Sequence, residues 1–324
     1  MTEPLLRIRN LRVWFPVGAA LFGKPAQLRA VDGVDFDLQA GEALGIVGES
    51  GCGKSTLARA ILRLVPSTAG QIVWMGQSIE GWSTRQVRPL RRDLQIVFQD
   101  PLASLDPRMT VGEIVAEPLR VHAPELSKAE RRERVADILR RVGLSPDVIN
   151  RYPHEFSGGQ CQRIGIARAM VLRPKLLVCD EPVSALDVSI QAQIVNLLQD
   201  LKRDFGMSIL FVSHNLAVVR KLCERVLVLY LGKPMELAPT EMLYSDPRHP
   251  YTRGLLAAVP IPDPAVQPLR LGTALGGELP SPLSPPSGCV FRTRCPMAEP
   301  QCAATAPTFD EVSDAHRVAC WRWR

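Results

Sequence analysis

The segment Gly48–Thr56, which reads GESGCGKST, is the feature that most constrains what this chain can fold into. It matches the pattern G-x-x-x-x-G-K-[ST] and lies between a buried strand expected over Ala43–Val47 and a helix expected from about Lys54 to Leu64. Glycines allow successive backbone N–H groups to curl around a phosphate, and the dipole of the following helix favours the negative charge. A chance glycine turn at the start of a helix would need neither the complete pattern nor a buried strand directly before it. The segment therefore predicts a phosphate-binding loop.

Two side chains of this loop have expected roles in binding a nucleotide. Lys54 should contact the β- and γ-phosphates, and the Ser55 hydroxyl should ligate Mg²⁺. Cys52 stands at a free position of the pattern and needs no function. Such a loop alone is typical of kinases, GTPases and many ATPases. The nucleotide-binding residues expected here are Gly48, Glu49, Ser50, Gly51, Cys52, Gly53, Lys54, Ser55 and Thr56.

A pair of acids follows an apolar run in LLVCDEP, Leu176–Pro182. Open parallel sheets bind their ligands at the carboxyl ends of the strands, where Asp180 and Glu181 would lie. Asp180 can orient Mg²⁺ or a water bound to it, and Glu181 can polarise the attacking water as a general base. By itself the pair could equally end a strand and start a turn. Together with the phosphate-binding loop it indicates nucleotide hydrolysis.

Strand and helix patterns alternate along most of the chain, which predicts an α/β fold with a largely parallel sheet covered by helices. Residues from Thr110 to Val171 read as helices and look inserted into that scaffold. The expected strands are Leu6–Val13, Arg29–Leu38, Ala43–Val47, Gln71–Met75, Leu94–Phe98, Leu176–Asp180, Ser208–Ser213 and Arg225–Tyr230, and the expected helices include Lys128–Val142, Ser189–Phe205 and Leu216–Leu222.

The composition changes after about Asp246. Thirteen of the 28 prolines fall in residues 247–324, so few long elements can form there. We therefore expect an ATPase domain over residues 1–247, with a helical subdomain at about 101–171. A Pro- and Cys-rich C-terminal extension should cover residues 248–324.

Membrane insertion and nucleic-acid binding are both disfavoured by the sequence. No apolar run approaches the ~20 residues that span a bilayer, and the N-terminal residues lack the apolar stretch of a signal peptide. The net charge is +6, but the arginines around Arg131 alternate with acids, as on a solvated helix face. We expect a cytosolic protein that reaches a membrane only through partners and binds no nucleic acid.

The segment FSGGQCQR, Phe156–Arg163, resembles the LSGGQ signature of ABC ATPases. Further motifs stand in the order of that family: Gln99 in IVFQDP resembles the Q-loop, Asp187 in SALD the D-loop, and His214 in FVSHN the H-loop. The resemblance implies a P-loop NTPase fold of the ABC type with an inserted α-helical subdomain, which binds and hydrolyses ATP with Mg²⁺. Asn215 stands where the family often has aspartate, which puts the local positioning of His214 in doubt.

The resemblance also implies roles for individual residues. Gln99 senses the γ-phosphate and Mg²⁺, and His214 contacts the γ-phosphate and acts with Glu181 in catalysis. Phe15 stands where the family stacks an aromatic ring on adenine, although a core or surface aromatic is an equal alternative. The signature residues and the D-loop residue meet the nucleotide bound by the opposite subunit; they are Ser157, Gly158, Gly159, Gln160 and Asp187.

Longer stretches narrow the resemblance to ATPases of oligopeptide and dipeptide importers. They include RHPYTRGLLAAVP at Arg248–Pro260 and the tail segment GELPSPLSPPSGCVFRTRCP. The insertion at residues 18–27 is similar to that of the second, F-type ATPase subunit. The implied partners are a different ABC ATPase subunit in a heterodimer, two integral membrane permeases and an external solute-binding protein. The implied location is the cytoplasmic face of the inner membrane, and the solute is a di- or oligopeptide or a related solute such as nickel or glutathione.

The sequence disfavours two other classes of function. A soluble ABC ATPase acting on DNA or ribosomes would carry a long coiled coil or a second cassette, and the sequence shows neither sustained heptads nor an internal repeat. A regulatory binding module would not need Glu181 and His214. The sequence favours the transport ATPase.

Four cysteines cluster near the C-terminus with the spacing C-x5-C-x6-C-x17-C: Cys289, Cys295, Cys302 and Cys320. In a reducing compartment such a cluster suggests a metal site more than disulfides, and the surrounding Pro-rich chain has no evident core. The C-x₂₋₄-C pairs common in zinc sites are absent, whereas Cys295-Pro296 resembles some iron–sulfur sites. The pattern favours a [4Fe–4S] cluster, with zinc or plain structural thiols as the alternatives.

Overall fold

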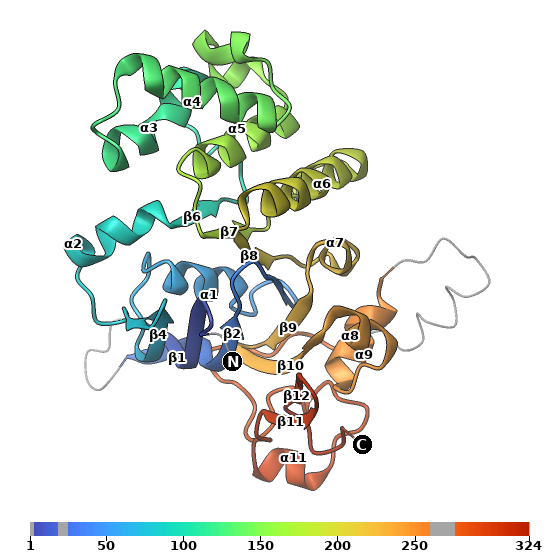
Figure 1. The fold of residues 1–324 in the computed structure, drawn as a ribbon. Helices are drawn as coiled ribbons and strands as arrows, with labels where there is room; N and C mark the ends of the chain where they lie inside the picture. Colours follow the sequence, from blue (N-terminus) through green and yellow to red (C-terminus); the bar gives the residue numbers. More distant parts are fainter. Residues whose placement is uncertain (1–2, 19–24, 260–275, 324) are drawn as a thin grey trace. The chain divides into compact units, whose positions relative to one another are not determined.

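The computed structural model describes residues 3–18, 25–259 and 276–323 (Figure 1). It divides into two compact units, each described by itself. The first comprises Met1–Leu38, Leu44–Glu80 and His214–Arg324, and the second comprises Gln39–Ala43 and Gly81–Ser213. The C-terminal extension thus belongs to the same unit as the phosphate-binding loop.

The first unit contains a small antiparallel sheet with the strand order β2-β1-β4-β5. Buried apolar residues alternate with more exposed ones along β1, where Leu6 and Ile8 point to the core, as expected for a sheet with one solvated face. The strands are β1 (Leu6–Val17), β2 (Ala26–Leu38), β4 (Ala69–Trp74) and β5 (Gln77–Ser78).

The first unit also contains five strands of a larger sheet, in the order β11-β12-β10-β9-β3. Strand β3 runs parallel to β9, while β10, β11 and β12 add antiparallel neighbours. Every residue of β3 is buried, which fits a strand covered on both faces. The strands are β3 (Ala43–Val47), β9 (Arg225–Tyr230), β10 (Lys233–Pro239), β11 (Asp310–Ser313) and β12 (His316–Val318); the helices are α1 (Lys54–Ile61), α7 (Leu216–Leu222), α8 (Thr240–Ser245), α9 (Pro250–Ala257) and α11 (Pro300–Ala304).

The second unit contains three parallel strands in the order β8-β7-β6 and a block of helices, α3 to α5, drawn in green in Figure 1. Capping boxes start all three of these helices, each with a Ser or Thr cap and a Glu or Gln three residues later. The strands are β6 (Leu94–Val97), β7 (Leu176–Asp180) and β8 (Ser208–Val212); the helices are α2 (Thr84–Val87), α3 (Val111–His122), α4 (Lys128–Arg141), α5 (Gly158–Met170) and α6 (Val188–Phe205). Short 3₁₀ turns cover Arg88–Arg92, Pro146–Asn150 and Pro153–Glu155.

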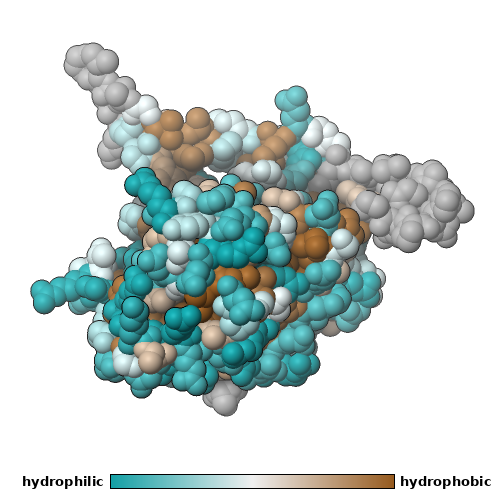
Figure 2. All heavy atoms as spheres, turned by 90° about the horizontal axis from the view of Figure 1, so that it is seen from above, coloured by the Kyte–Doolittle hydropathy of each residue, from teal (hydrophilic) through white to brown (hydrophobic). Residues whose placement is uncertain are grey.

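The alternation expected from the sequence is confirmed, and the bounds of β3, β7, β9 and α7 are the expected ones. Strand β10 and the elements of the extension were not anticipated. None of the helices among the described residues is long and apolar enough to cross a membrane. Figure 2 shows a mainly hydrophilic face with separate hydrophobic areas.

A buried carboxylate attaches the C-terminal extension to β10. Glu236 is fully buried, and it accepts hydrogen bonds from the backbone N–H groups of Arg248 (2.7 Å) and His249 (3.0 Å) and lies 2.8 Å from Nε2 of His316. Burial by itself would raise the pKa of Glu236, but these hydrogen bonds outweigh it and hold the pKa below its ordinary value. The charged carboxylate therefore joins β10 to β12 and to the start of α9.

The neighbouring imidazole of His249 is also buried and caps α9, because its Nδ1 accepts the N–H of Tyr251 at 3.0 Å. Burial is the main cause that lowers its pKa from 6.5 to about 4. Between these values the unfolded chain binds a proton that the folded chain does not. The free energy of unfolding must therefore fall as the pH drops through this window.

Replacing His249 with Asn should flatten that pH dependence, since Asn keeps a cap acceptor but does not titrate. We expect wild type to lose about 3 kcal/mol more stability than H249N between pH 7 and pH 4, because the pKa of His249 falls from 6.5 to about 4 on folding. Urea unfolding at several pH values measures this, with H154N at an exposed histidine as the control. An unchanged slope in H249N would contradict the assignment.

Candidate active site

The phosphate-binding loop connects β3 to α1 in the first unit and is packed tightly at two of its glycines. A Cβ at Gly48 would lie 2.2 Å from the carbonyl oxygen of Leu229, and one at Gly53 would lie 1.9 Å from that of Ala30. Both residues also have positive φ, 152° and 102°. Only glycine fits there, so the loop rests directly on β2 and β9.

The ammonium group of Lys54 lies inside this loop. The side chain is buried, and Nζ donates to the carbonyl oxygens of Gly48 (2.9 Å) and Glu49 (3.0 Å). These two oxygens hold a positive charge at the amino end of α1, where phosphate oxygens are favoured. The arrangement can accept an anion by exchanging carbonyl contacts for phosphate contacts.

The C-terminal extension contacts the loop through residues that the sequence analysis did not assign. The backbone N–H of Glu49 donates to the hydroxyl of Tyr251 at 3.0 Å, and its carboxylate forms two hydrogen bonds with the Arg294 guanidinium. Both partners fall in the tail segments that resemble the peptide importers. That resemblance was a signal for the region but not for these contacts.

In the second unit, the predicted base Glu181 lies beside Gln99, which was predicted to contact the nucleotide and Mg²⁺. Asp180 is buried at the carboxyl end of β7, and Glu181 follows it. Gln99, just after β6, places its Nε2 3.4 Å from Oε2 of Glu181. Glu181 has a φ of 49°, and its N–H donates to the carbonyl of Val212 at 3.0 Å. The carboxylate is therefore presented at the strand edge from a left-handed backbone that β8 fixes.

The signature residues form the exposed start of α5. Ser157 is the N-cap: its Oγ accepts the N–H of Gln160 at 3.4 Å, while Oε1 of Gln160 accepts the N–H of Ser157 at 3.0 Å. A Cβ at Gly159 would lie 2.8 Å from Ile190, so glycine lets α5 approach α6 closely. Asp187 is the exposed residue before α6.

The remaining predicted residues lie in the first unit. His214 is exposed, and Asn215 after it caps α7 by accepting the N–H groups of Ala217 (3.1 Å) and Val218 (3.3 Å). Asparagine thus serves as the helix cap at this position. Phe15 is half-buried in β1 opposite Leu28.

The prediction of a metal site in the tail is wrong. Across residues 3–18, 25–259 and 276–323, no three His, Cys, Asp or Glu side chains form a group that could hold a metal ion, so neither the [4Fe–4S] cluster nor zinc is supported. Cys289, Cys295, Cys302 and Cys320 form no disulfide either. Burial raises the pKa of Cys289 to about 11 and raises those of Cys295 and Cys320, which favours the protonated thiols. The tail instead has a small core, in which Val290 and Phe291 are buried.

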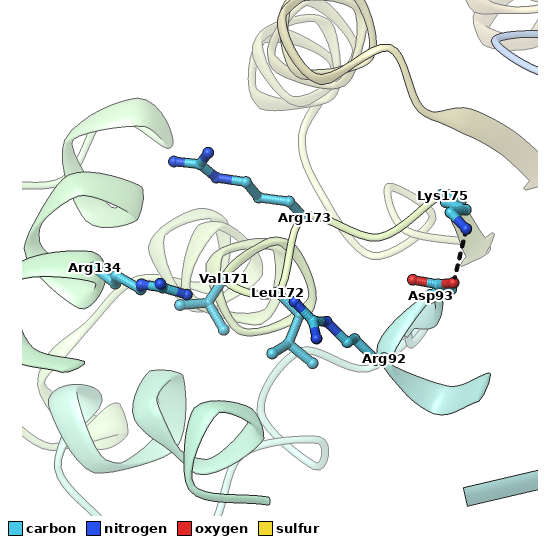
Figure 3. A pocket seen from close by; sticks show the side chains of 7 residues that line it. All are labelled: Arg92, Asp93, Arg134, Val171, Leu172, Arg173 and Lys175. Atoms are coloured by element: carbon cyan, nitrogen blue, oxygen red, sulfur yellow. Dashed lines mark ion pairs between the residues drawn. The ribbon is translucent and has the colours of Figure 1, made fainter. Parts of the chain in front are cut away.

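A separate cavity of about 580 Å³ lies in the second unit at the amino ends of β6 and β7 (Figure 3). Lys175 and Asp93 form an ion pair of 3.2 Å at one side of it. Gln99, Asp180 and Glu181 stand at the opposite, carboxyl ends of these strands. The cavity is therefore not part of the predicted hydrolytic site. Its lining residues are Arg92, Asp93, Arg134, Val171, Leu172, Arg173 and Lys175.

Two glycines of the loop should respond differently to alanine. Gly51 has a φ of 80°, and no atom of the described residues lies within 4 Å of a Cβ built there. A Cβ at Gly53 would in addition overlap the carbonyl oxygen of Ala30. G51A should lower the free energy of unfolding by about 1–2 kcal/mol from backbone strain alone, and G53A by about 1–3 kcal/mol more. Denaturant unfolding of the two variants measures the difference; equal losses would contradict the described packing.

Comparison with known proteins identifies two family regions. Residues 31–184 match the ABC transporter family, and residues 235–302 match the oligopeptide/dipeptide transporter C-terminal region. Among solved structures, the dimeric post-hydrolysis ATP-binding cassette MJ0796 bound to ADP and Pi is similar, with a TM-score of 0.66, 29% identity, and 72% of this chain and 98% of that chain covered. The structure of cbiO1 from Clostridium perfringens is also similar, with a TM-score of 0.65 and 26% identity. The match covers 76% of this chain and 92% of that chain.

Relatives match over almost the whole chain. The oligopeptide transport ATP-binding protein OppF of Escherichia coli is 58% identical over 98% of this chain and 95% of its own length, and that of Salmonella typhimurium is 57% identical with the same coverage. OppF of Haemophilus influenzae is 55% identical over 98% of this chain and 97% of its own length. The chain therefore belongs to the family of oligopeptide transport ATP-binding proteins of ABC transporters.

Proposed function

We propose that this chain is the ATP-hydrolysing subunit that powers the import of oligopeptides through an ABC transporter. The observation that carries the proposal is the identity of 55–58% to oligopeptide transport ATP-binding proteins, which extends through the C-terminal region as well as the cassette. The shared tail supports a peptide as the solute over an unrelated one. We infer an ATPase domain over residues 1–247, with its helical subdomain at about 101–171, and an extension over 248–324.

The residues present fit a nucleotide with Mg²⁺. The loop from Gly48 to Thr56 offers N–H groups and the Lys54 ammonium to the phosphates. Hydroxyl, carboxylate and amide oxygens, the donors that Mg²⁺ takes, are available from Ser55, Asp180 and Gln99. Because Nε2 of Gln99 faces Glu181, its amide oxygen is the atom suited to the cation. When bound, Mg²⁺ would neutralise charge on the β- and γ-phosphates.

In hydrolysis, Glu181 acts as the general base that accepts the proton of the attacking water. Gln99 orients that carboxylate through the 3.4 Å contact between Nε2 and Oε2. His214 contacts the γ-phosphate, and Phe15 stacks on the adenine. The base has to stand at a fixed distance from the water, and the left-handed backbone of Glu181 anchored on β8 serves that positioning.

We infer that the chain works as a heterodimer with a second ABC ATPase. The signature start of α5, from Ser157 to Gln160, is largely exposed, so it is available to cap the nucleotide of a partner. Val188 beside Asp187 is 82% exposed, which suits an apolar contact at the same interface. Two membrane permeases and an external binding protein complete the importer, with this chain peripheral to the cytoplasmic face of the membrane.

Replacing Glu181 with Gln should leave ATP binding intact and lower turnover by ~10²–10⁴, the usual contribution of a general base. The variant should accumulate with its partner as a closed, nucleotide-bound dimer, which size-exclusion chromatography with ATP detects. E125Q, at an exposed carboxylate of the same unit, should hydrolyse ATP like wild type. Near-normal hydrolysis in E181Q would refute the role of Glu181.

The isolated chain should hydrolyse ATP slowly, and the partner ATPase with the permeases should accelerate it. G158D should remove this acceleration, because the new charge would face the partner's phosphate. The side chain itself fits, since the nearest described atom to a Cβ at Gly158 belongs to Leu186 at 3.8 Å. Steady-state hydrolysis and uptake of a labelled oligopeptide into proteoliposomes test both statements. Full activity of a strict monomer, or an assembled complex that moves no peptide, would contradict the proposal.

A further inference from the structure

All three polar groups of Glu49 are held by protein partners. Its N–H donates to Tyr251, its carbonyl accepts from Lys54, and its carboxylate accepts two hydrogen bonds from Arg294, with Nη1–Oε2 at 2.6 Å and Nη2–Oε1 at 3.0 Å. Such a bidentate pair fixes orientation as well as distance. The side chain of Glu49 thus points to the C-terminal extension and ties the phosphate-binding loop to it.

Arg294 is itself held firmly. Its side chain is only 5% exposed, Nε donates to the carbonyl of Gly276 at 3.0 Å, and the guanidinium lies 5.8 Å from the ring centroid of Tyr230. The hydrogen bonds with Glu49 raise the pKa of Arg294 above its already high ordinary value, so the group stays charged. Because the planar guanidinium of Arg294 contacts Glu49, Gly276 and Tyr230, it holds the carboxylate of Glu49 in one preferred orientation.

The support behind this pair is a buried aromatic cluster made of Tyr230, Tyr251 and Phe291. The ring centroids lie 4.8 Å apart for Tyr230 and Tyr251, and 5.3 Å from each of these to Phe291. The three residues come from β9, α9 and the tail segment that also carries Arg294. Packed aromatic rings have few rotamers, so this cluster is a rigid base for the contacts on Glu49.

A glycine-rich loop binds phosphate only when its N–H groups converge, and glycine makes many other conformations accessible. If only a fraction of molecules holds the converged loop, the apparent Kd rises by the inverse of that fraction. The contacts of Tyr251 and Arg294 with Glu49 raise the fraction of molecules that hold the converged loop, although neither residue would contact the phosphates. The extension would then contribute to nucleotide affinity from outside the nucleotide site.

We propose that Arg294, acting through Glu49 and supported by Tyr251, is a positioning residue that preorganises the phosphate-binding loop for ATP. The inference deepens the proposed function and rests on it. It makes the C-terminal extension a working part of the ATPase. A purely structural ion pair, which would only fasten the extension, predicts lower stability with unchanged nucleotide affinity.

The full-length chain and the variants R294A, E49A, the double variant and R294K distinguish these roles. Binding of a ribose-labelled fluorescent ATP analogue gives Kd, hydrolysis in the assembled transporter gives kcat and KM, and hydrogen exchange without nucleotide reports on the amides of residues 48–55. R292A is the matched control, since Arg292 lies in the same tail segment and, among the described residues, donates to Ser287 and not to the phosphate-binding loop.

R294A and E49A should each raise Kd about tenfold, and R294A should raise KM by the same factor with kcat at saturating ATP nearly unchanged. The double variant should be no worse than either single one, because both remove the same contact. R294K keeps the positive charge but not the bidentate geometry of the guanidinium. Its Kd should therefore lie between those of wild type and R294A. The amides of the phosphate-binding loop should exchange faster in R294A than in wild type. In R292A they should exchange at the wild-type rate.

Wild-type Kd and loop exchange in R294A, even with a lowered Tm, would overturn the inference. Additive losses in the double variant, or the same loss in R292A, would also overturn it. If the wild-type chain binds no ATP at all, the proposed function fails instead, and the exchange rates of the loop amides still decide whether Arg294 holds the loop.

Discussion

The buried carboxylate of Glu236 is the interaction on which the C-terminal part of the first unit depends. An ionised carboxylate without partners inside a protein would be destabilising by several kcal/mol, so the hydrogen-bond donors around it are required. They come from the start of α9 and from His316 on β12. Because α9 carries Tyr251 and the chain leading to β12 carries Arg294, this one group also locates the residues that hold Glu49.

The phosphate-binding loop illustrates how a charged side chain is kept stable inside such a site. The ammonium of Lys54 is buried, yet it lies within hydrogen-bond distance of two carbonyl oxygens of its own loop. Binding of a phosphate is therefore an exchange of partners, and the affinity reflects the difference between the two sets of contacts. A loop held in place by the extension does not have to be ordered when the anion arrives, which lowers the entropic cost of binding.

Much of the fold could be predicted because the signals were local. Strands β3, β7 and β9 are short, almost wholly apolar runs with clear ends, and their predicted bounds match the structure. Strand β10 gave no such signal, since it contains two prolines and Glu236. Only the tertiary donors described above make that sequence stable as a buried strand.

The contacts and the tail show why the rest could not be predicted. Glu49 and Arg294 are 245 positions apart, and no pattern within either segment points to the other. The metal hypothesis assumed that the Pro-rich tail lacks a core, but Phe291 packs against Tyr251 of α9 and against Tyr230 of β9, which lies outside the tail. Cysteine spacing carries no information about such packing. The metal site was therefore predicted for a segment that is already stabilised by packing against residues distant in the sequence.

The backbone of Glu181 has an evolutionary consequence. A non-glycine residue in the left-handed region loses about 1–2 kcal/mol, and the chain retains that strain at the residue proposed as the base. Glycine at this position would relieve the strain while removing the carboxylate. In the folding free energy, the relief of strain would offset the lost contact between Gln99 and Glu181. Selection on folding alone cannot preserve this residue; only selection on transport can.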